Sequence, residues 1–240
     1  MAKLNVKHFK YIDAGKAAMK FLLPEKIMDS LAFRLFRSWV FQGVLYMEYS
    51  EIIFRIFLEI ILVALFLYIL PSYGQYVEIV LAVVLAHTYM WTFNGHFWAL
   101  SIGDNRRMAK NTPERILSYF NNLDKRVHNS RAIDGCVMFG SLTRGEFTEN
   151  SDLDVLLCKK DGYINLFRAY IFGFRERFIA FVTMVPIELY FYNIDVFDRL
   201  DDKEAPLLFK DASGDIRKVI KNYIDFKNYP FNKQVFFSSL

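Results

Sequence analysis

The sequence predicts two kinds of structure: a hairpin of two transmembrane α-helices and, after it, an α/β domain in which helices flank a small sheet. Two nearly continuous apolar runs, residues 52–70 and 77–100, indicate the hairpin. Two short apolar segments, residues 135–139 and 153–157, lie between stretches of helical periodicity and indicate the sheet. Hydrophobic residues make up 54% of the 240, and 25 residues are Phe. Because this apolar content exceeds that of ordinary soluble domains, it has to be concentrated in part of the chain.

The first 50 residues are basic and are predicted to form an amphipathic helical segment. Six lysines precede residue 27, and no early apolar core with a small-residue cleavage site indicates a signal peptide. From residue 27 onward, apolar residues recur every three to four positions, with Arg34 and Arg37 between them. A helix of this kind either lies in a membrane interface or packs on its own protein. Both interpretations stay open for residues 27–47.

Residues 51–100 are assigned to the hairpin because each apolar run supplies the roughly 20 residues that a spanning helix requires. Pro71 and Gly74 mark the turn between the runs. This turn contains no Lys or Arg, whereas both flanks of the hairpin are basic, as in residues 106–110. By the positive-inside rule, we expect a multi-pass protein of the cell membrane whose two ends face the cytoplasm.

Several polar side chains of the hairpin are costly in hydrocarbon and need partners. Arg55 and Glu59 are four residues apart and are spaced to pair on one helix face. The second helix carries His87, Trp91, Asn94 and His96. We favour a role for these residues in holding helices together over a role in lining a substrate groove. Because two helices offer few partners, the sequence also predicts a homo-oligomer.

The α/β domain is predicted over residues 101–228, followed by an aromatic tail over residues 229–240. Thr112 and Pro113 have the pattern of a helix start, with a capping hydroxyl and a proline in the first turn. Ser213 is expected to cap the last helix. The two cysteines, Cys136 and Cys158, lie in the predicted strands and are expected to be small buried hydrophobic residues.

A further helix is predicted over residues 163–181, and a third strand over residues 185–192. The helical apolar face comprises Phe167, Tyr170, Ile171, Phe174 and Phe178. Outside this face lie Arg168, Arg175 and Arg177. Such arginines form either a solvated face or a basic face that rests on lipid headgroups, and both interpretations remain open.

Acidic residues open the second strand. Gly140-Ser141 ends the first strand, ten residues follow, and Asp152-Leu153-Asp154 begins the second. Side chains alternate along a strand, so the two aspartates point to one face while the leucine points to the core. Two carboxylates on one face suit a hard cation such as Mg²⁺, which is usually held by one or two carboxylates together with substrate phosphates.

The glycine and serine between the strands suit the phosphates of a nucleotide. Gly140 lets the backbone approach a phosphate closely, and the N-terminus of a following helix would favour an anion. Arg144 lies where it adds a charged donor. The sequence therefore predicts that a metal and a nucleotide bind together.

The succession of FGS, a spacer and SDLDVLL resembles the signature of the DNA polymerase beta-type nucleotidyltransferase superfamily, especially its minimal members. The resemblance covers residues 111–221 and implies a small mixed sheet flanked by helices. It also implies a third acidic residue on a later strand. Glu188, within VPIELYFY, fits that position, although Asp is commoner there.

The resemblance implies the transfer of a nucleoside monophosphate from a triphosphate such as ATP to an acceptor, with release of pyrophosphate. The residues expected to be catalytic are also the expected ligands of two Mg²⁺ ions, or of Mn²⁺ in their place: Asp152, Asp154 and Glu188. The residues expected to bind the nucleotide are Gly140, Ser141 and Arg144.

The acceptor and the base of the nucleotide cannot be read from the residues. The membrane hairpin beside the catalytic segment favours a lipid-linked or membrane-associated acceptor. The net charge of +4 is mild, and no basic block is interleaved with aromatic residues, so no nucleic-acid partner is expected. The alternatives are a catalytically inactive nucleotide-binding membrane sensor or assembly protein, and a structural membrane protein whose soluble domain docks a partner.

Overall fold

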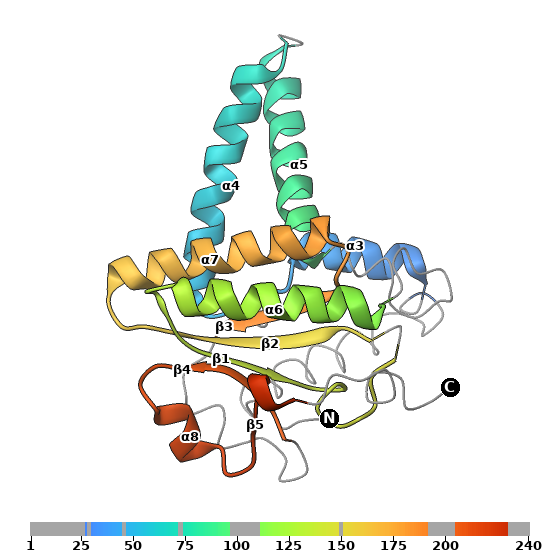
Figure 1. The fold of residues 1–240 in the computed structure, drawn as a ribbon. Helices are drawn as coiled ribbons and strands as arrows, with labels where there is room; N and C mark the ends of the chain where they lie inside the picture. Colours follow the sequence, from blue (N-terminus) through green and yellow to red (C-terminus); the bar gives the residue numbers. More distant parts are fainter. Residues whose placement is uncertain are drawn as a thin grey trace.

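The computed structural model describes residue 27 and residues 30–44, 47–71, 74–96, 111–148, 151–191 and 205–229. In this part of the chain, two long helices project from an α/β body (Figure 1). The predictions for the lysine-rich residues 1–26, for the basic segment 97–110 and for the tail from residue 230 onward fall outside the described residues.

The body is built on a five-stranded sheet in the order β3-β2-β1-β4-β5. Strand β1 is antiparallel to both β2 and β4, whereas β2 and β3, like β4 and β5, are parallel. This mixed sheet with its flanking helices confirms the predicted fold class. The strands are β1 (Ile133–Phe139), β2 (Leu153–Lys159), β3 (Ile187–Phe191), β4 (Leu207–Asp211) and β5 (Ile224–Asp225).

The two faces of the sheet are covered differently. Helices α6 (Pro113–Asn129) and α7 (Tyr163–Val182) cover one face, where Val155 and Leu157 of β2 belong to the main core. On the opposite face, Leu156 belongs to a smaller cluster with Ile216 of α8 (Asp215–Val219). The 3₁₀ turn Phe226–Asn228 follows β5, and its Phe226 belongs to the main core. Because side chains alternate along β2, Asp154 lies on this second, less covered face. The second face is therefore the one with room for a site.

Helix α6 begins as the sequence predicts and carries the principal buried ion pair of the body. Thr112 Oγ1 accepts a hydrogen bond from Arg115 N at 3.3 Å, and Pro113 is the first helical residue. Arg126 donates from Nε and from its terminal nitrogen to the two carboxylate oxygens of Glu176, both at 2.7 Å. Glu176 on α7 is 0% exposed, so this bidentate pair holds α6 to α7 inside the fold.

Replacing Arg126 with alanine is expected to lower the free energy of unfolding by about 3–5 kcal/mol, because it leaves the buried Glu176 charge without its partner. Chemical denaturation in detergent measures this change. Lys125→Ala, at an exposed position of the same helix, should change stability by less than about 0.5 kcal/mol. A double variant, Arg126→Met with Glu176→Leu, should recover most of the loss; a double variant as unstable as the single one would contradict the assignment.

The sheet-facing side of α7 differs from the predicted one. Small residues face the sheet, and a Cβ added to Gly173 would collide with the ring of Phe191. The buried positions of α7 are Ala169, Tyr170, Phe172, Gly173, Glu176, Arg177 and Ala180. Of the predicted apolar face, Phe167, Ile171 and Phe178 are exposed. The prediction is right for Tyr170, which is buried against Phe191, and wrong for these three residues. Helix α7 packs so closely on the sheet at Gly173 that a small residue is needed there, and the three large apolar residues point outward.

The projecting hairpin consists of α4 (Tyr49–Ile69) and α5 (Gln75–Phe93). Both helices are long and apolar enough to cross a membrane by length and composition, and very little of either is buried in the fold. Ala82 and Ala86, both 0% exposed, are small residues of α5 that allow close packing against α4. The core helix of a soluble protein would be covered on most sides, which these helices are not.

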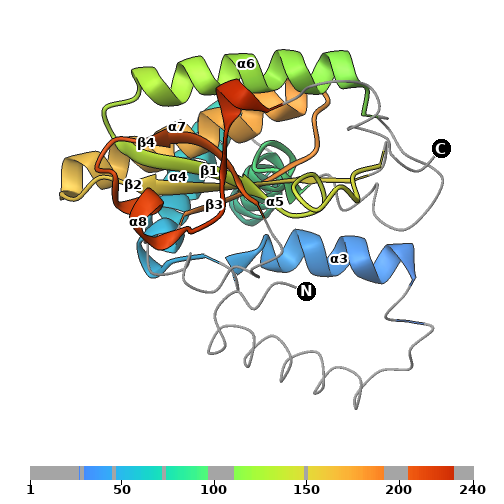
Figure 2. The same ribbon diagram turned by 60° about the horizontal axis from the view of Figure 1, so that its bottom comes forward.

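Helix α3 (Leu31–Phe41) lies across the base of the hairpin, as Figures 1 and 2 show. Ser30 Oγ caps it by accepting from Phe33 N. Trp39 Nε1 donates to Thr88 Oγ1 at 3.1 Å, and Trp91 Nε1 donates to Ser38 Oγ at 3.0 Å. For residues 27–47, the sequence left open whether the helix lies in a membrane interface or packs on its own protein. Helix α3 of this segment packs on α5, although its Phe36 and Phe41 are exposed.

The polar residues of the hairpin hold helices together. His87 contacts Glu59 Oε1 through Nδ1 at 2.7 Å and Trp39 O through Nε2 at 2.9 Å. Arg55 donates at 2.8 Å to Glu51, which lies one turn earlier on α4, and Glu59 pairs with His87 of α5. These two contacts replace the pairing expected between Arg55 and Glu59. These partners come from the same chain, so the polar residues of the hairpin do not need a second copy to pair with, and the homo-oligomer stays a prediction.

Two smaller predictions have mixed outcomes. Cys136 and Cys158 are free and buried, as expected. At the last helix, Asp211 takes most of the capping role expected of Ser213, because its carboxylate accepts from Ile216 N at 3.3 Å and Arg217 N at 3.1 Å. Ser213 Oγ accepts from Asp215 N at 3.3 Å but does not cap the helix interior.

Candidate active site

Strand β1 leads directly into a tight turn over residues 141–145. Gly140 has a φ of 91°, which strongly favours glycine, and a Cβ there would collide with Asp154 Oδ2. Thr143 Oγ1 donates to Gly140 O at 3.0 Å, and Arg144 N donates to the same oxygen at 3.2 Å. The helix expected after Gly140 and Ser141 is this turn, because Gly145 at a φ of 71° leads the chain out of a helical path.

The sheet register brings the predicted acidic residues to neighbouring positions. Asp154 of β2 is paired with Phe139 of β1 on one side and with Glu188 of β3 on the other. Asp152 lies immediately before β2 and, two residues from Asp154, points to the same face. Asp152 and Glu188 are exposed and Asp154 is half-buried. The three carboxylates thus lie on two adjacent strands, on the face that α6 and α7 leave free.

The segment before Asp152 is held by contacts that the sequence did not reveal. Asn111, which is 3% exposed, donates from Nδ2 to Ser151 O at 2.7 Å. Ser151 Oγ accepts from Thr148 N at 3.0 Å and contacts Thr148 Oγ1 at 3.1 Å. Because Asn111 precedes α6 by two residues, the start of that helix fixes the approach to β2. No sequence signal marks Asn111 beyond its place beside a helix cap.

Glu188 is the carboxyl group of the site whose protonation differs most clearly from an ordinary glutamate. Partial loss of hydration at the carboxylate and the negative charge of Asp152 raise the pKa of Glu188, and the Tyr190 hydroxyl donates to Glu188 Oε2 and opposes this rise. The side chain remains exposed in part, so the carboxylate is accessible from solvent. A raised pKa beside other carboxylates is typical of a group that binds a cation or exchanges a proton.

The raised pKa of Glu188 predicts a pH-dependent stability. A carboxyl group that binds its proton more tightly in the folded state destabilises the fold once it ionises. In metal-free protein, Glu188→Gln should therefore match the wild type below the ordinary glutamate pKa, and should become the more stable of the two as pH rises through the folded pKa. Thermal unfolding with EDTA across this range measures the difference, which Mg²⁺ should remove; a constant difference at all pH values would contradict it.

The donor set around this turn fits a divalent cation bound together with a phosphate. The carboxylates offer oxygen ligands only, as Mg²⁺ prefers. Ser141 Oγ is buried without a hydrogen-bond partner among the described residues, directly beside the close approach of Gly140 to Asp154. No three His, Cys, Asp or Glu side chains in the described part of the chain are close enough to form a ready metal-binding group. Side-chain rotation on the two strands would thus have to bring the carboxylates together around an ion.

Arg144 is placed at the rim of the site. Its Nε donates to Glu146 Oε2 at 3.0 Å, and the side chains of Arg144 and Glu146 are 36% and 66% exposed. A solvent-exposed pair of this kind contributes little to stability, and the guanidinium lies on the same turn as Gly140 and Ser141. Arg144 therefore fits the predicted charged donor without being fixed in that role.

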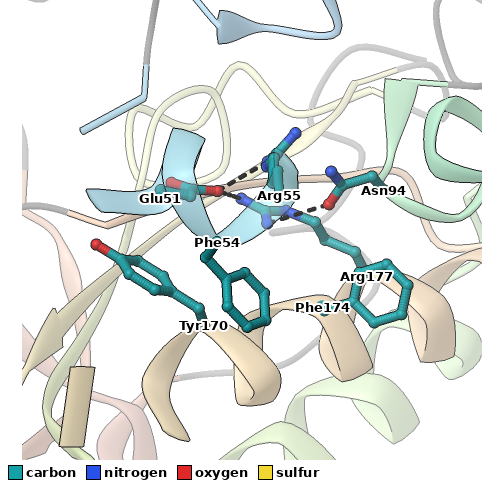
Figure 3. Close-up of a pocket in the computed structure, with 7 residues that line it drawn as sticks. All are labelled: Glu51, Phe54, Arg55, Asn94, Tyr170, Phe174 and Arg177. Atoms are coloured by element: carbon teal, nitrogen blue, oxygen red, sulfur yellow. Dashed lines mark hydrogen bonds and ion pairs between the residues drawn. The ribbon is translucent and has the colours of Figure 1, made fainter. Parts of the chain in front are cut away.

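A buried polar cluster at the base of the hairpin joins Arg177 to Glu51 and Asn94 (Figure 3), and Arg177 also binds the strand that carries Glu188. Arg177 of α7 donates to Glu51 of α4 at 3.0 Å, to Asn94 at the end of α5 at 3.2 Å and to Leu189 O of β3 at 2.7 Å. Arg177 is 6% exposed, contrary to its predicted place outside the buried face. The available signal was its spacing from Gly173, four residues earlier on the same helix face.

The hairpin base thereby covers the open edge of the sheet. Strand β3 is the edge strand, and a Cβ on Gly95 would lie 3.6 Å from Ile187 O. Arg177 of α7 donates to Leu189 O, a carbonyl group of the same edge strand. Glu188 lies between Ile187 and Leu189 on this edge strand. Of the three acidic site residues, it is therefore the one on the strand next to the hairpin base.

A five-stranded mixed sheet flanked by helices, with a glycine-serine turn and carboxylates on adjacent strands, defines an α/β nucleotidyltransferase fold. Residues 121–211 match the family model described as nucleotidyltransferase domain, and this segment contains all six predicted site residues. The match supports the nucleotidyltransferase superfamily for this part of the chain and nucleoside monophosphate transfer in general. No curated protein and no solved structure matched the chain.

Proposed function

We propose that this chain is a membrane-anchored, metal-dependent nucleotidyltransferase that acts on an acceptor held at the membrane. The observation that carries the catalytic part is the register of the sheet, which puts Asp154 beside the Gly140 turn on one side and Glu188 on the other. The family match over residues 121–211 supports the same reaction class.

The proposed reaction is attack of an acceptor oxygen on the α-phosphorus of a nucleoside triphosphate, with cleavage of the bond to the β-phosphate and loss of pyrophosphate. Two Mg²⁺ ions, or Mn²⁺ in their place, would neutralise the triphosphate and lower the pKa of the acceptor hydroxyl. Asp152 and Asp154 would bind the metal ions. Glu188, with its raised pKa, would take the proton from the acceptor hydroxyl. Ser141 Oγ, the Gly140 backbone and Arg144 would orient the triphosphate.

The membrane part of the proposal rests on the exposure of α4 and α5. Exposed tyrosines stand at both ends of the hairpin, with Tyr49 at the base and Tyr68 and Tyr76 at the tip. Tyrosines at the two ends of an apolar helix are typical of the two membrane interfaces. The orientation with both chain ends in the cytoplasm, where nucleoside triphosphates and Mg²⁺ are present, remains part of this proposal.

A membrane-held acceptor is favoured because the edge strand β3, which carries Glu188, lies beside the hairpin base, where Gly95 approaches Ile187 O. Figure 1 shows β3 nearest to the hairpin and β4 and β5 farthest from it. A lipid-linked or membrane-associated hydroxyl or phosphate would then reach the carboxylates without a large movement of the domain.

Pyrophosphate release by the full chain in lipid nanodiscs tests this function, with each nucleoside triphosphate, Mg²⁺ and a membrane lipid extract. We expect release that depends on both Mg²⁺ and the extract, and mass analysis of the lipid fraction should show the added nucleoside monophosphate. Binding of a nucleotide without release in any combination would instead support the catalytically inactive membrane sensor. Release that is indifferent to lipid would contradict the membrane-held acceptor.

A further inference from the structure

Helix α7 has a second apolar face that no described residue of the body covers. Its inner face packs on the sheet through small residues such as Gly173 and through Tyr170. Its outer face carries a stripe, called here the outer stripe, whose exposed fractions range from 38% to 68%: Ile164, Phe167, Ile171, Phe178 and Val182. Positions three, four or seven residues apart lie on one side of a helix, so the stripe is continuous along α7. A water-facing helix surface would instead be polar.

The outer stripe faces the same side of the body as the hairpin. Phe54 of α4 packs on Phe167, with ring centroids 5.5 Å apart, and Phe93 of α5 packs on Phe178 at 5.2 Å. The bases of both hairpin helices therefore stand on α7, which runs beneath them and across their direction (Figure 1). Ile171 lies between the two contacts and is 45% exposed.

The charges at the edge of the outer stripe are positive. Arg168 and Arg175 are exposed and follow one flank of the stripe along α7. The only acidic residue of α7, Glu176, is fully buried against Arg126. An apolar stripe with basic residues at its edge is the surface that binds the interface of a membrane with anionic lipid.

The height of the hairpin gives an independent reason for this placement. Above its contact with α7, helix α4 continues from Phe54 to Ile69, a rise of about 22 Å at the usual 1.5 Å per residue. The hydrocarbon core of a bilayer is roughly 30 Å thick. The tyrosines at the tip therefore reach the far interface only if α7 itself enters the near interface. Interfacial helices lie about 5–10 Å deep, which matches the difference between the length of α4 above α7 and the thickness of the hydrocarbon core.

We infer that the outer stripe of α7 is a second membrane contact, which lies flat in the interface of a bilayer containing anionic lipid; this inference rests on the proposed membrane hairpin. The catalytic domain is then held against the bilayer along the length of α7 and does not hang from the hairpin alone. Helix α3 lies beside the hairpin base at a similar level, with Phe36 and Phe41 exposed, and adds apolar surface there. This placement keeps β3 and Glu188 at a fixed height near the membrane surface.

Spin-label depth measurements on the full chain in proteoliposomes test this inference. Single cysteines are introduced by Ile171→Cys in the outer stripe, Val80→Cys at an exposed position of the hairpin and Lys125→Cys at an exposed position of α6. The native Cys136 and Cys158 are buried, and burial raises the pKa of Cys158 to about 12, so both should label slowly. Protein without an introduced cysteine measures their background.

With phosphatidylcholine and phosphatidylglycerol vesicles, we expect the labels at positions 80 and 171 to collide more often with oxygen than with a water-soluble nickel complex. The label at position 125 should show the reverse order. An Ile171→Cys label in water together with a Val80→Cys label in lipid would overturn the inference and leave the hairpin intact. Both labels in water would mean that the proposed membrane hairpin has failed as well.

Two further arms separate the bilayer from other occupants of the stripe. A label at position 171 that is shielded from both reagents, with spin–spin broadening lost on dilution with unlabelled protein, would show a second copy of the chain on the stripe and overturn the inference. The variant Arg168→Gln with Arg175→Gln should reduce the gain in depth that phosphatidylglycerol gives over phosphatidylcholine alone. An unchanged gain would contradict the role of these arginines with anionic lipid.

Discussion

Replacing Asp154 with alanine is expected to lower pyrophosphate release by about 10³-fold or more, because a phosphoryl-transfer site acts almost entirely by positioning and charge neutralisation. Asp154 is the central carboxylate of the site, since it is paired in register with Glu188 and lies against Gly140. The rate is measured with the full chain in nanodiscs at saturating Mg²⁺ and triphosphate.

The fold should survive this change. Asp154 is half-buried on the less covered sheet face and is not part of the main apolar core, so its replacement leaves the core packing intact. We expect the unfolding temperature of Asp154→Ala to stay close to that of the wild type. Asp161→Ala, which removes an exposed carboxylate from the loop after β2, serves as the matched control and should keep full activity. Near-normal activity in Asp154→Ala would refute the assignment of the site.

Replacing Arg177 with alanine is expected to lower the free energy of unfolding by about 3 kcal/mol and to reduce kcat. The loss lies at the lower end for a broken buried ion pair, because Arg55 still pairs with Glu51. It includes the carbonyl group of Leu189, which loses its charged donor. Since Leu189 adjoins Glu188, a looser β3 should affect kcat more than the KM for the triphosphate.

Chemical denaturation in detergent and steady-state kinetics in nanodiscs separate these two effects. Arg175→Ala, two residues away and exposed, should change stability in detergent by less than about 0.5 kcal/mol. Arg177→Lys should recover part of the loss, because one ammonium group cannot reach all three partners of the guanidinium. If Arg177→Ala unfolds like the wild type, the buried cluster does not join the hairpin to the catalytic domain.

Local patterns predicted much of the fold. The length and apolar character of the two runs predicted α4 and α5, and the hydroxyl and proline at residues 112–113 predicted the start of α6. Alternation along residues 152–157 predicted that Asp154 lies opposite Val155, as the two clusters on the sheet faces confirm. Each of these features depends on residues close together in the chain, which is why periodicity was enough.

The largest error concerns α7 and the contacts of its arginines. An apolar period of 3.6 residues shows that a helix has a face but not which surface covers it. Helix α7 has two apolar faces, and its close approach at Gly173 puts small residues, together with Tyr170, against the sheet. Arg177 was therefore placed outside the buried side, although it is the residue that binds Glu51, Asn94 and Leu189 together.

By itself, the sequence determined the order of the elements as far as β3, the six candidate site residues and the two helices long enough to cross a membrane, because each is written in neighbouring residues. The tertiary structure alone decided that Glu188 stands beside Asp154, that Arg55 pairs with Glu51 and not with Glu59, and that the hairpin base covers β3. These relations join residues far apart along the chain. They depend on strand order, register and the depth to which helices pack, which a linear pattern does not contain.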